Sequence, residues 1–137
     1  MREILFRGKP MDDNEWIYGG ALHQTDCYGD KVDRWFIIDG TETNDYSIGY
    51  PEIVIPETIG QYTGLSDKNG KKIFEGDIVL YNGEKHIVVF EIRGGTGYFG
   101  IKIDHIETWR FCLSVPAKLM EVIGNIYDNQ ELVEGML

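Results

Sequence analysis

Residues 76–99 read GDIVLYNGEKHIVVFEIRGGTGYF, and this stretch decides the fold class. It holds three short runs rich in β-branched and aromatic residues, separated by an Asn-Gly pair and by a cluster of glycines. Both separators are strong turn signals, because these residues tolerate positive φ angles. The predicted strands are Ile78–Tyr81, Lys85–Ile92 and Tyr98–Ile103. Short strands joined by glycine-rich turns are typical of a small barrel, so we predict an SH3-like barrel here.

Outward from this stretch, the pattern of short runs and turns continues in both directions. The further predicted strands are Glu3–Arg7, Glu15–Tyr18 with its continuation Leu22–Asp26, Arg34–Ile38, Ile53–Ile55, Thr58–Thr63, Ile73–Phe74 and Glu121–Tyr127. The segment 104–110 is too mixed to indicate an element. Helix is expected only as a short turn over residues 128–135, with Asp128 or Asn129 as its N-cap. Alternation within the longest run places four residues on one face: His86, Val88, Phe90 and Ile92.

The fold class that follows is mainly β with little helix: a small N-terminal β meander and a C-terminal SH3-like barrel. We predict a β lobe over residues 1–57, in which the segment 39–57 is irregular, and an SH3-like lobe over residues 58–137. One compact domain spanning both lobes is the alternative. Within the irregular segment, residues 39–50 are the expected place of a mobile or variable insertion.

The composition limits the classes of partner. The 137 residues carry 23 Asp and Glu against 13 Lys and Arg, a net charge of −10. This acidity disfavours nucleic acid and anionic membranes as partners, and favours basic or apolar ones. The longest apolar runs have four residues, whereas a spanning helix needs about 20, and the N-terminus lacks the apolar stretch of a signal peptide. We therefore expect a cytoplasmic protein without membrane contact, with Cys27 and Cys112 as free thiols.

Patterns that indicate chemistry occur only in isolation. Gly95–Gly100 matches G-x-G-x-x-G, but the alternating residues after it predict a strand and not the helix of a dinucleotide site. The turn at Asp67–Lys72 fails as a calcium loop, because its glycine stands at the fourth position and not the sixth. Candidates for a zinc site are widely spaced: His23, Cys27, His86, His105 and Cys112. We predict no cofactor, no metal and no catalytic residue.

Aromatic residues are spread over most of the predicted strands. There they can fill a thin β core, since aromatic rings suit a pleated surface. The alternative is an exposed strip that stacks single-stranded bases or anchors a protein partner, beside lysines that form a local positive patch. The possible binding surface consists of Tyr62, Lys68, Lys71, Lys72, Tyr98 and Trp109.

Three segments, taken together and in this order, resemble the YopX family of phage and prophage proteins of Gram-positive bacteria. They are REILFRG at residues 2–8 with EWIYG at 15–19, QYTGLSDKNGKKIFEGDIV at 61–79, and EVIGNIYDNQEL at 121–132. One departure is Gln130, where relatives often have Pro. The resemblance implies a mainly β protein with an SH3-like C-terminal part, made in the host cytoplasm. It implies no known activity, so no catalytic residue can be transferred to this chain.

The residues of these segments have a structural interpretation. Asp67–Gly70 sets the register of a hairpin, with Asn69 and Gly70 suited to positive φ angles, and Gly76-Asp77 leads tightly into a strand. Gly124 relaxes a strand near its end, and Arg7 makes a buried or half-buried polar contact where residues 6–8 pack on residues 61–64. The structural motif residues are Arg7, Gly64, Asp67, Asn69, Gly70, Gly76, Asp77 and Gly124.

Three functions remain to be weighed. The first is a non-enzymatic accessory protein that binds a host or phage protein, which the acidic charge and the lack of assembled chemistry favour. The second is single-stranded nucleic-acid binding by the SH3-like lobe. The third is an enzyme acting on a small substrate, for which His86, His105 and Glu107 would have to converge in a pocket. Exposed strand edges and aromatic residues also make a homo-oligomer plausible.

Overall fold

The structure is a computed structural model that describes residues 3–39, 51–104 and 107–135. It is mainly β, as predicted. The strands are β1 (Phe6–Gly8), β2 (Ile17–Cys27), β3 (Asp30–Asp39), β4 (Pro51–Val54), β5 (Gly60–Ser66), β6 (Lys72–Phe74), β7 (Asp77–Tyr81), β8 (Glu84–Arg93), β9 (Thr96–Lys102), β10 (Thr108–Arg110) and β11 (Glu121–Asn125). Helix in the described ranges consists of the short 3-10 turns η1 (Pro56–Thr58), η2 (Ala117–Leu119) and η3 (Gln130–Val133), and none of these is long enough to cross a membrane.

The chain divides into two compact units, unit 1 (Met1–Gln61) and unit 2 (Tyr62–Leu137). In unit 1 the strand order is β4-β3-β2-β1-β5, and every pair is antiparallel. Its buried residues include Ile37 and Val54, which lie against the backbone of Gly8. A Cβ added to Gly8 would come within 3.2 Å of Val54 Cβ, so a larger residue would require Val54 and Ile37 to shift by a few tenths of an ångström.

The segment 39–57, expected to be irregular, is regular wherever the structure describes it. Pro51–Val54 pairs with β3, and Pro56–Thr58 forms η1. Within this segment the sequence predicts an extended run at Ile53–Ile55, since a proline restricts the residue before it, and β4 overlaps that run. Pro51 begins an edge strand, a position that does not require its missing N–H. The predicted insertion lies almost entirely in residues 40–50, outside the described residues.

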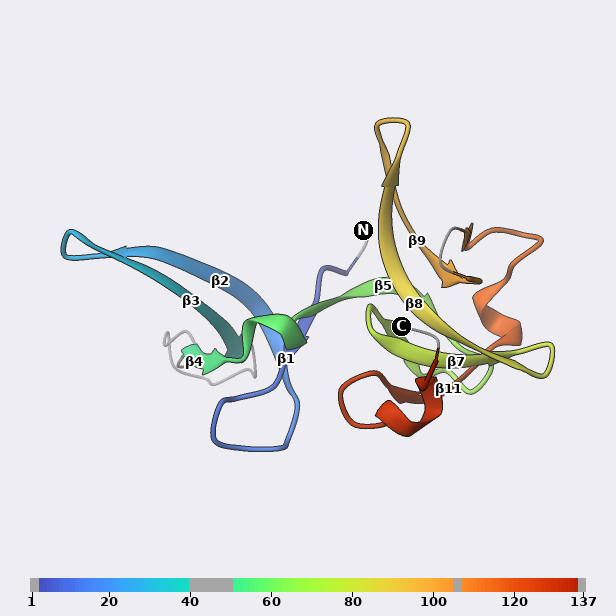
Figure 1. The fold of residues 1–137 in the computed structure, drawn as a ribbon, viewed down its shortest axis with the longest axis horizontal. Helices are drawn as coiled ribbons and strands as arrows, with labels where there is room; N and C mark the ends of the chain where they lie inside the picture. Colours follow the sequence, from blue (N-terminus) through green and yellow to red (C-terminus); the bar gives the residue numbers. More distant parts are fainter. Residues whose placement is uncertain (1–2, 40–50, 105–106, 136–137) are drawn as a thin grey trace. The chain divides into compact units, whose positions relative to one another are not determined.

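Unit 2 contains a five-stranded antiparallel sheet in the order β10-β9-β8-β7-β11 (Figure 1). β6 pairs with β5 and is not part of this five-stranded sheet. Successive residues of a strand point to opposite faces, and both faces of this sheet carry a core. One core, cluster 1, consists of Ile73, Val79, Tyr81, Val88, Ile101, Ala117 and Met120. The other, cluster 2, consists of Ile78, Ile87 and Val133, with Leu132 and Ile126 packed against it, so the C-terminal η3 covers this face. This arrangement is compatible with the predicted SH3-like barrel.

The hairpin of β8 and β9 extends beyond both clusters (Figure 1). His86 and Val88 are buried, whereas Phe90 and Ile92, on the same face, are 46% and 69% exposed. The predicted face therefore exists, but only its first half belongs to the core. Close to the turn, the ring of Phe90 covers Gly97, where an added Cβ would lie 2.6 Å from the ring.

β10 has no counterpart among the predicted strands. Its three residues pair with β9, and Arg110 lies opposite Gly100. An added Cβ at Gly100 would lie 2.3 Å from the carbonyl oxygen of Trp109, so glycine is required for the two backbones to approach. β10 thus depends on a residue of the neighbouring strand and not on its own propensity.

The carboxylate of Asp67 joins two distant parts of unit 2. Its Oδ1 accepts the backbone N–H groups of Asn69 and Lys71, and its Oδ2 accepts that of Val122 in β11, all at 2.9 Å. Burial by itself would raise the pKa of this carboxyl, but the three N–H donors and the charge of Lys71 together hold the pKa below its usual value. In the same turn Gly70 has a φ of 79°, while Asn69 does not share the predicted positive φ.

We expect Asp67→Asn to destabilise unit 2 by about 2–3 kcal/mol, because an amide group would present a donor to one of the N–H groups. The pKa of Asp67 is lower in the folded than in the unfolded protein, so its carboxylate stabilises the fold at pH values above the unfolded-state pKa of about 4. This contribution is lost as the pH falls through the pKa of the folded protein. The difference from wild type in urea unfolding should therefore be large at pH 7 and shrink below pH ~4. Asp12→Asn, at an exposed position, is the control; equal effects of both variants would contradict this role.

The other motif residues also have structural roles. Gly76 has a φ of 90°, donates its N–H to Val88 and accepts the N–H of Ile126. Asp77 Oδ2 accepts the N–H of Phe74 and so closes the turn before β7. At Gly124 a Cβ would lie 2.4 Å from Asn129 Oδ1.

Arg7 of β1 is 5% exposed and lies opposite Gly60 of β5. Its guanidinium carbon is 4.6 Å from the centre of the Trp16 ring, and Lys9 Nζ is 5.5 Å from the same centre. A cation over an indole face is attracted by the negative charge of that face. The pairing of β1 with β5 and the ring of Trp16 together hold this arginine inside unit 1.

We expect Arg7→Ala to destabilise the protein by about 1–2 kcal/mol, through loss of the packed side-chain stem and of the cation–π contact. Thermal unfolding followed by circular dichroism would measure this. Arg34→Ala, which removes an exposed arginine of β3, should leave the midpoint nearly unchanged. A midpoint for Arg7→Ala equal to that of Arg34→Ala would refute a packing role.

Candidate functional site

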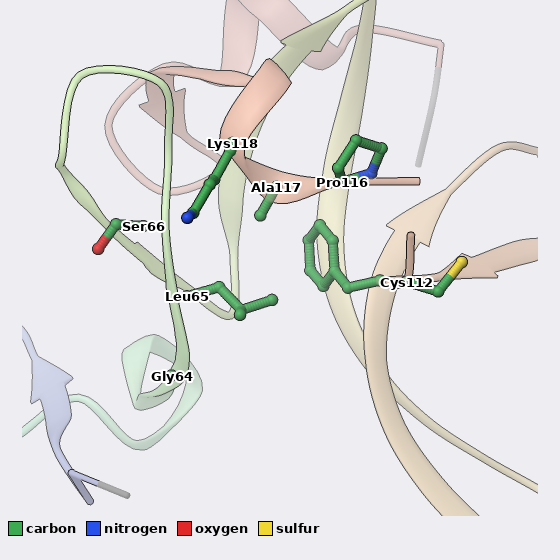
Figure 2. Close-up of a pocket in the computed structure, with 8 residues that line it drawn as sticks. Gly64, Leu65, Ser66, Cys112, Pro116, Ala117 and Lys118 are labelled. Atoms are coloured by element: carbon green, nitrogen blue, oxygen red, sulfur yellow. The ribbon is translucent and has the colours of Figure 1, made fainter. Parts of the chain in front are cut away.

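An apolar groove opens on the surface of unit 2, between the end of β5, the residues after β10 and η2 (Figure 2). Its volume is about 450 Å³. The lining residues are Gly64, Leu65, Ser66, Phe111, Cys112, Pro116, Ala117 and Lys118. Ala117 belongs to cluster 1 and Phe111 packs against it, so the floor of the groove is the outer surface of that core. The groove is therefore backed by rigid structure.

Local backbone features shape each wall. Gly64 has a φ of 86°, and the pairing of β5 with β6 shifts register between Tyr62 and Ser66, so β5 is irregular at the groove. The opposite wall begins with Pro116, whose carbonyl accepts the N–H of Leu119 in the turn of η2. Both walls thus consist of backbone bends that expose side chains near the core.

The chemistry of the groove differs from that of the chain as a whole. Among the described residues that line the groove, Lys118 is the one that carries a charge, and none is a carboxylate. Leu65 is 39% exposed, and Leu119 beside Lys118 is 66% exposed. Figure 2 shows the Lys118 side chain extending toward the side of the groove formed by Ser66. The groove can thus take an apolar group and place a cation beside it.

Cys112 lines the groove, but its sulfur points away from Leu65 and Ala117 (Figure 2). A hydrogen bond with Ser114 Oγ, at 3.2 Å from Sγ, is the main cause that lowers the pKa of this thiol. Hydrogen bonds with the backbone of Ser114 and Val115 and the charge of Arg110 act in the same direction. The thiol is exposed, and its sulfur does not point into the groove.

We expect Cys112 to react with iodoacetamide faster near pH 7 than an unperturbed thiol, because a lowered pKa increases the thiolate fraction. The rate is measured against pH in a Cys27→Ser background. Ser114→Ala should move the inflection to higher pH, whereas Ser66→Ala should not. An unchanged inflection in Ser114→Ala would contradict this account.

Four residues of the predicted binding surface lie on the β5–β6 hairpin. Tyr62 is 8% exposed and packs on Phe74, so its ring belongs to the interior and not to a stacking platform. Lys72 Nζ lies 5.6 Å from the centre of that ring. Lys68 pairs with Glu121 at 3.3 Å, and Lys71 is exposed in the turn. These lysines share one hairpin, but the aromatic ring among them is covered.

The other two residues lie on β9 and β10. Tyr98 is half-buried beside Arg110, whose guanidinium carbon is 6.0 Å from the ring centre. Trp109 is 41% exposed, and its Nε1 donates a hydrogen bond to Glu107 Oε1 at 2.8 Å. An acidic partner beside the exposed indole makes this ring a poor platform for a polyanion.

The candidate metal and catalytic residues are separated. His23 stacks on Trp35 and contacts Asp33 Oδ1 at 2.6 Å in unit 1, while His86 is buried in unit 2 with Nδ1 3.3 Å from the Lys102 carbonyl oxygen. His105 lies outside the described residues. Among the residues that the structure describes, no three His, Cys, Asp or Glu side chains gather in a way that could hold a metal ion.

The glycine motif at residues 95–100 lies in a hairpin. Gly95 has a φ of 81° in the turn, and Thr96–Lys102 is strand β9, which confirms the strand predicted after the motif. A dinucleotide site would need a helix at that place. No comparable pattern in the sequence indicates the groove, because its lining residues come from three separate segments.

Comparisons with known proteins agree with this architecture. The family described as YopX protein matches residues 5–134. Among solved structures, the crystal structure of protein EF1440 from Enterococcus faecalis is similar, with 26% identity and a TM-score of 0.50. That match covers 97% of this chain and 99% of the other. A search of curated proteins finds no match.

Proposed function

This chain belongs to the YopX family, and we propose that it is a phage or prophage accessory protein that acts without catalysis, by binding a protein of the host or the phage. The site of binding is the groove of unit 2. The protein acts in the host cytoplasm, and its binding needs no cofactor.

The groove itself is the observation that supports this proposal. A concave apolar surface of about 450 Å³, backed by a packed core, suits the side chains of a partner segment. The described residues of its lining include no pair of acid and base groups that could transfer protons, since Lys118 is the one charged residue among them and Cys112 points outward. Binding is therefore the activity to which this surface is best suited.

A protein partner is better supported than single-stranded nucleic acid. Stacking of bases needs exposed aromatic rings next to cations. Tyr62 is covered, Trp109 is bonded to Glu107, and Lys68 is paired with Glu121. The net charge of −10 also disfavours nucleic acid, because it opposes the approach of a polyanion.

The test is affinity capture from host lysate with nuclease, comparing wild type and Leu65→Glu. Leu65 is a half-exposed wall of the groove, so a carboxylate there should abolish capture of an apolar partner without unfolding unit 2. Ile92→Glu, an equivalent change at the β8–β9 hairpin, is the matched control and should retain capture.

Mass spectrometry of the captured proteins decides between the outcomes. A protein recovered in stoichiometric amounts with wild type and with Ile92→Glu, and lost with Leu65→Glu, supports binding by the groove. Capture that disappears on nuclease treatment would instead support nucleic acid, and capture unaffected by Leu65→Glu would place the binding surface elsewhere.

A further inference from the structure

We propose that the groove of unit 2 recognises an acidic peptide segment, with apolar side chains seated on the floor and a carboxylate placed beside Lys118. This inference rests on the function proposed above and specifies the chemistry of the partner. The net charge of −10, taken alone, favours a basic or apolar partner instead.

The apolar part of the recognition follows from the lining. Leu65, Phe111, Pro116 and Ala117 supply hydrocarbon surface from two walls and the floor. Ala117 is 6% exposed and held in cluster 1, so the floor does not need to rearrange to accept a side chain. An apolar anchor in a preformed pocket gives affinity with little ordering cost.

The charged part follows from Lys118. In residues 3–39, 51–104 and 107–135, no carboxylate forms an ion pair with its ammonium group. Two other cations of unit 2 have contacts of their own, since Lys68 pairs with Glu121 and the guanidinium carbon of Arg110 lies 6.0 Å from the centre of the Tyr98 ring. Lys118 thus remains to bind a carboxylate, and it would repel a cationic segment lying in the same groove.

The charge of the chain as a whole does not cancel this local preference. Unit 1 carries 12 Asp and Glu residues against 5 Lys and Arg, a net charge of −7. Unit 2 carries 11 against 8, a net charge of −3. Charges farther away than about 8 Å are largely screened at physiological ionic strength. The net charge of distant parts of the chain therefore has little effect on a carboxylate in contact with Lys118.

The experiment selects peptides from a random 12-residue display library on the immobilised full chain. Peptides enriched on wild type should combine Leu, Ile, Phe or Trp with nearby Asp or Glu. Lys118→Glu should weaken their binding by roughly fivefold or more, since an attraction becomes a repulsion. Lys85→Glu makes the same change of charge on an exposed lysine of β8 and should alter binding less than about twofold. Thermal unfolding of each variant verifies that it is folded.

The outcomes separate the two proposals. Enriched peptides that are basic or uncharged, or whose binding is unaffected by Lys118→Glu while Leu65→Glu abolishes it, would overturn the acidic specificity and leave groove binding intact. Failure to enrich any peptide, or enrichment that Leu65→Glu does not affect, would overturn both. A preference of Lys118→Glu for peptides with Lys or Arg next to the same apolar anchors would give the strongest support.

Discussion

The carboxylate of Asp67 is the contact on which the groove of unit 2 depends. Its three N–H donors are those of Asn69 and Lys71, in the turn after β5, and that of Val122 in β11. Asp67 and Val122 are 55 residues apart in the sequence. The neighbouring Lys68 N–H donates to the carbonyl of Met120, and its ammonium pairs with Glu121. One wall of the groove ends immediately before Asp67, and η2 of the other wall ends immediately before Met120. The same contacts that close the fold therefore set the distance between the walls.

The segments that resemble the family mostly build this framework. Gly76 links β8 to the chain after β11 through two backbone hydrogen bonds, and Asn125 organises the final turn. Its Oδ1 accepts the N–H groups of Tyr127 and Asp128, while its own N–H donates to Asn129 Oδ1. The groove is shared between this framework and the rest of unit 2. Gly64, Leu65 and Ser66 lie within the second of the three segments, and the other five lining residues lie outside them.

The sequence predicted elements that depend on local chemistry. The alternation in β8, and the Asn82-Gly83 turn, in which both residues have positive φ angles, can be recognised from the residues themselves. It did not predict β10, whose formation depends on Gly100 in a different strand. Nor could it separate the buried Tyr62 from the exposed Phe90, because burial depends on where a strand leaves the core. The groove could not be predicted from the sequence for the same reason, because the tertiary fold is needed to bring Leu65, Phe111 and Lys118 together.

The division of charge between the units changes how acidity should be used in assigning a partner. Net charge acts over the whole surface and affects encounter and solubility, whereas recognition depends on the few charges within a screening length of the contact. In this chain the excess of carboxylates is greatest in unit 1, and the groove of unit 2 presents one unpaired lysine within the described residues. The charge of unit 1 and the proposed role of the groove therefore concern different residues. An acidic composition and a site for an acidic segment are compatible, because different residues determine each.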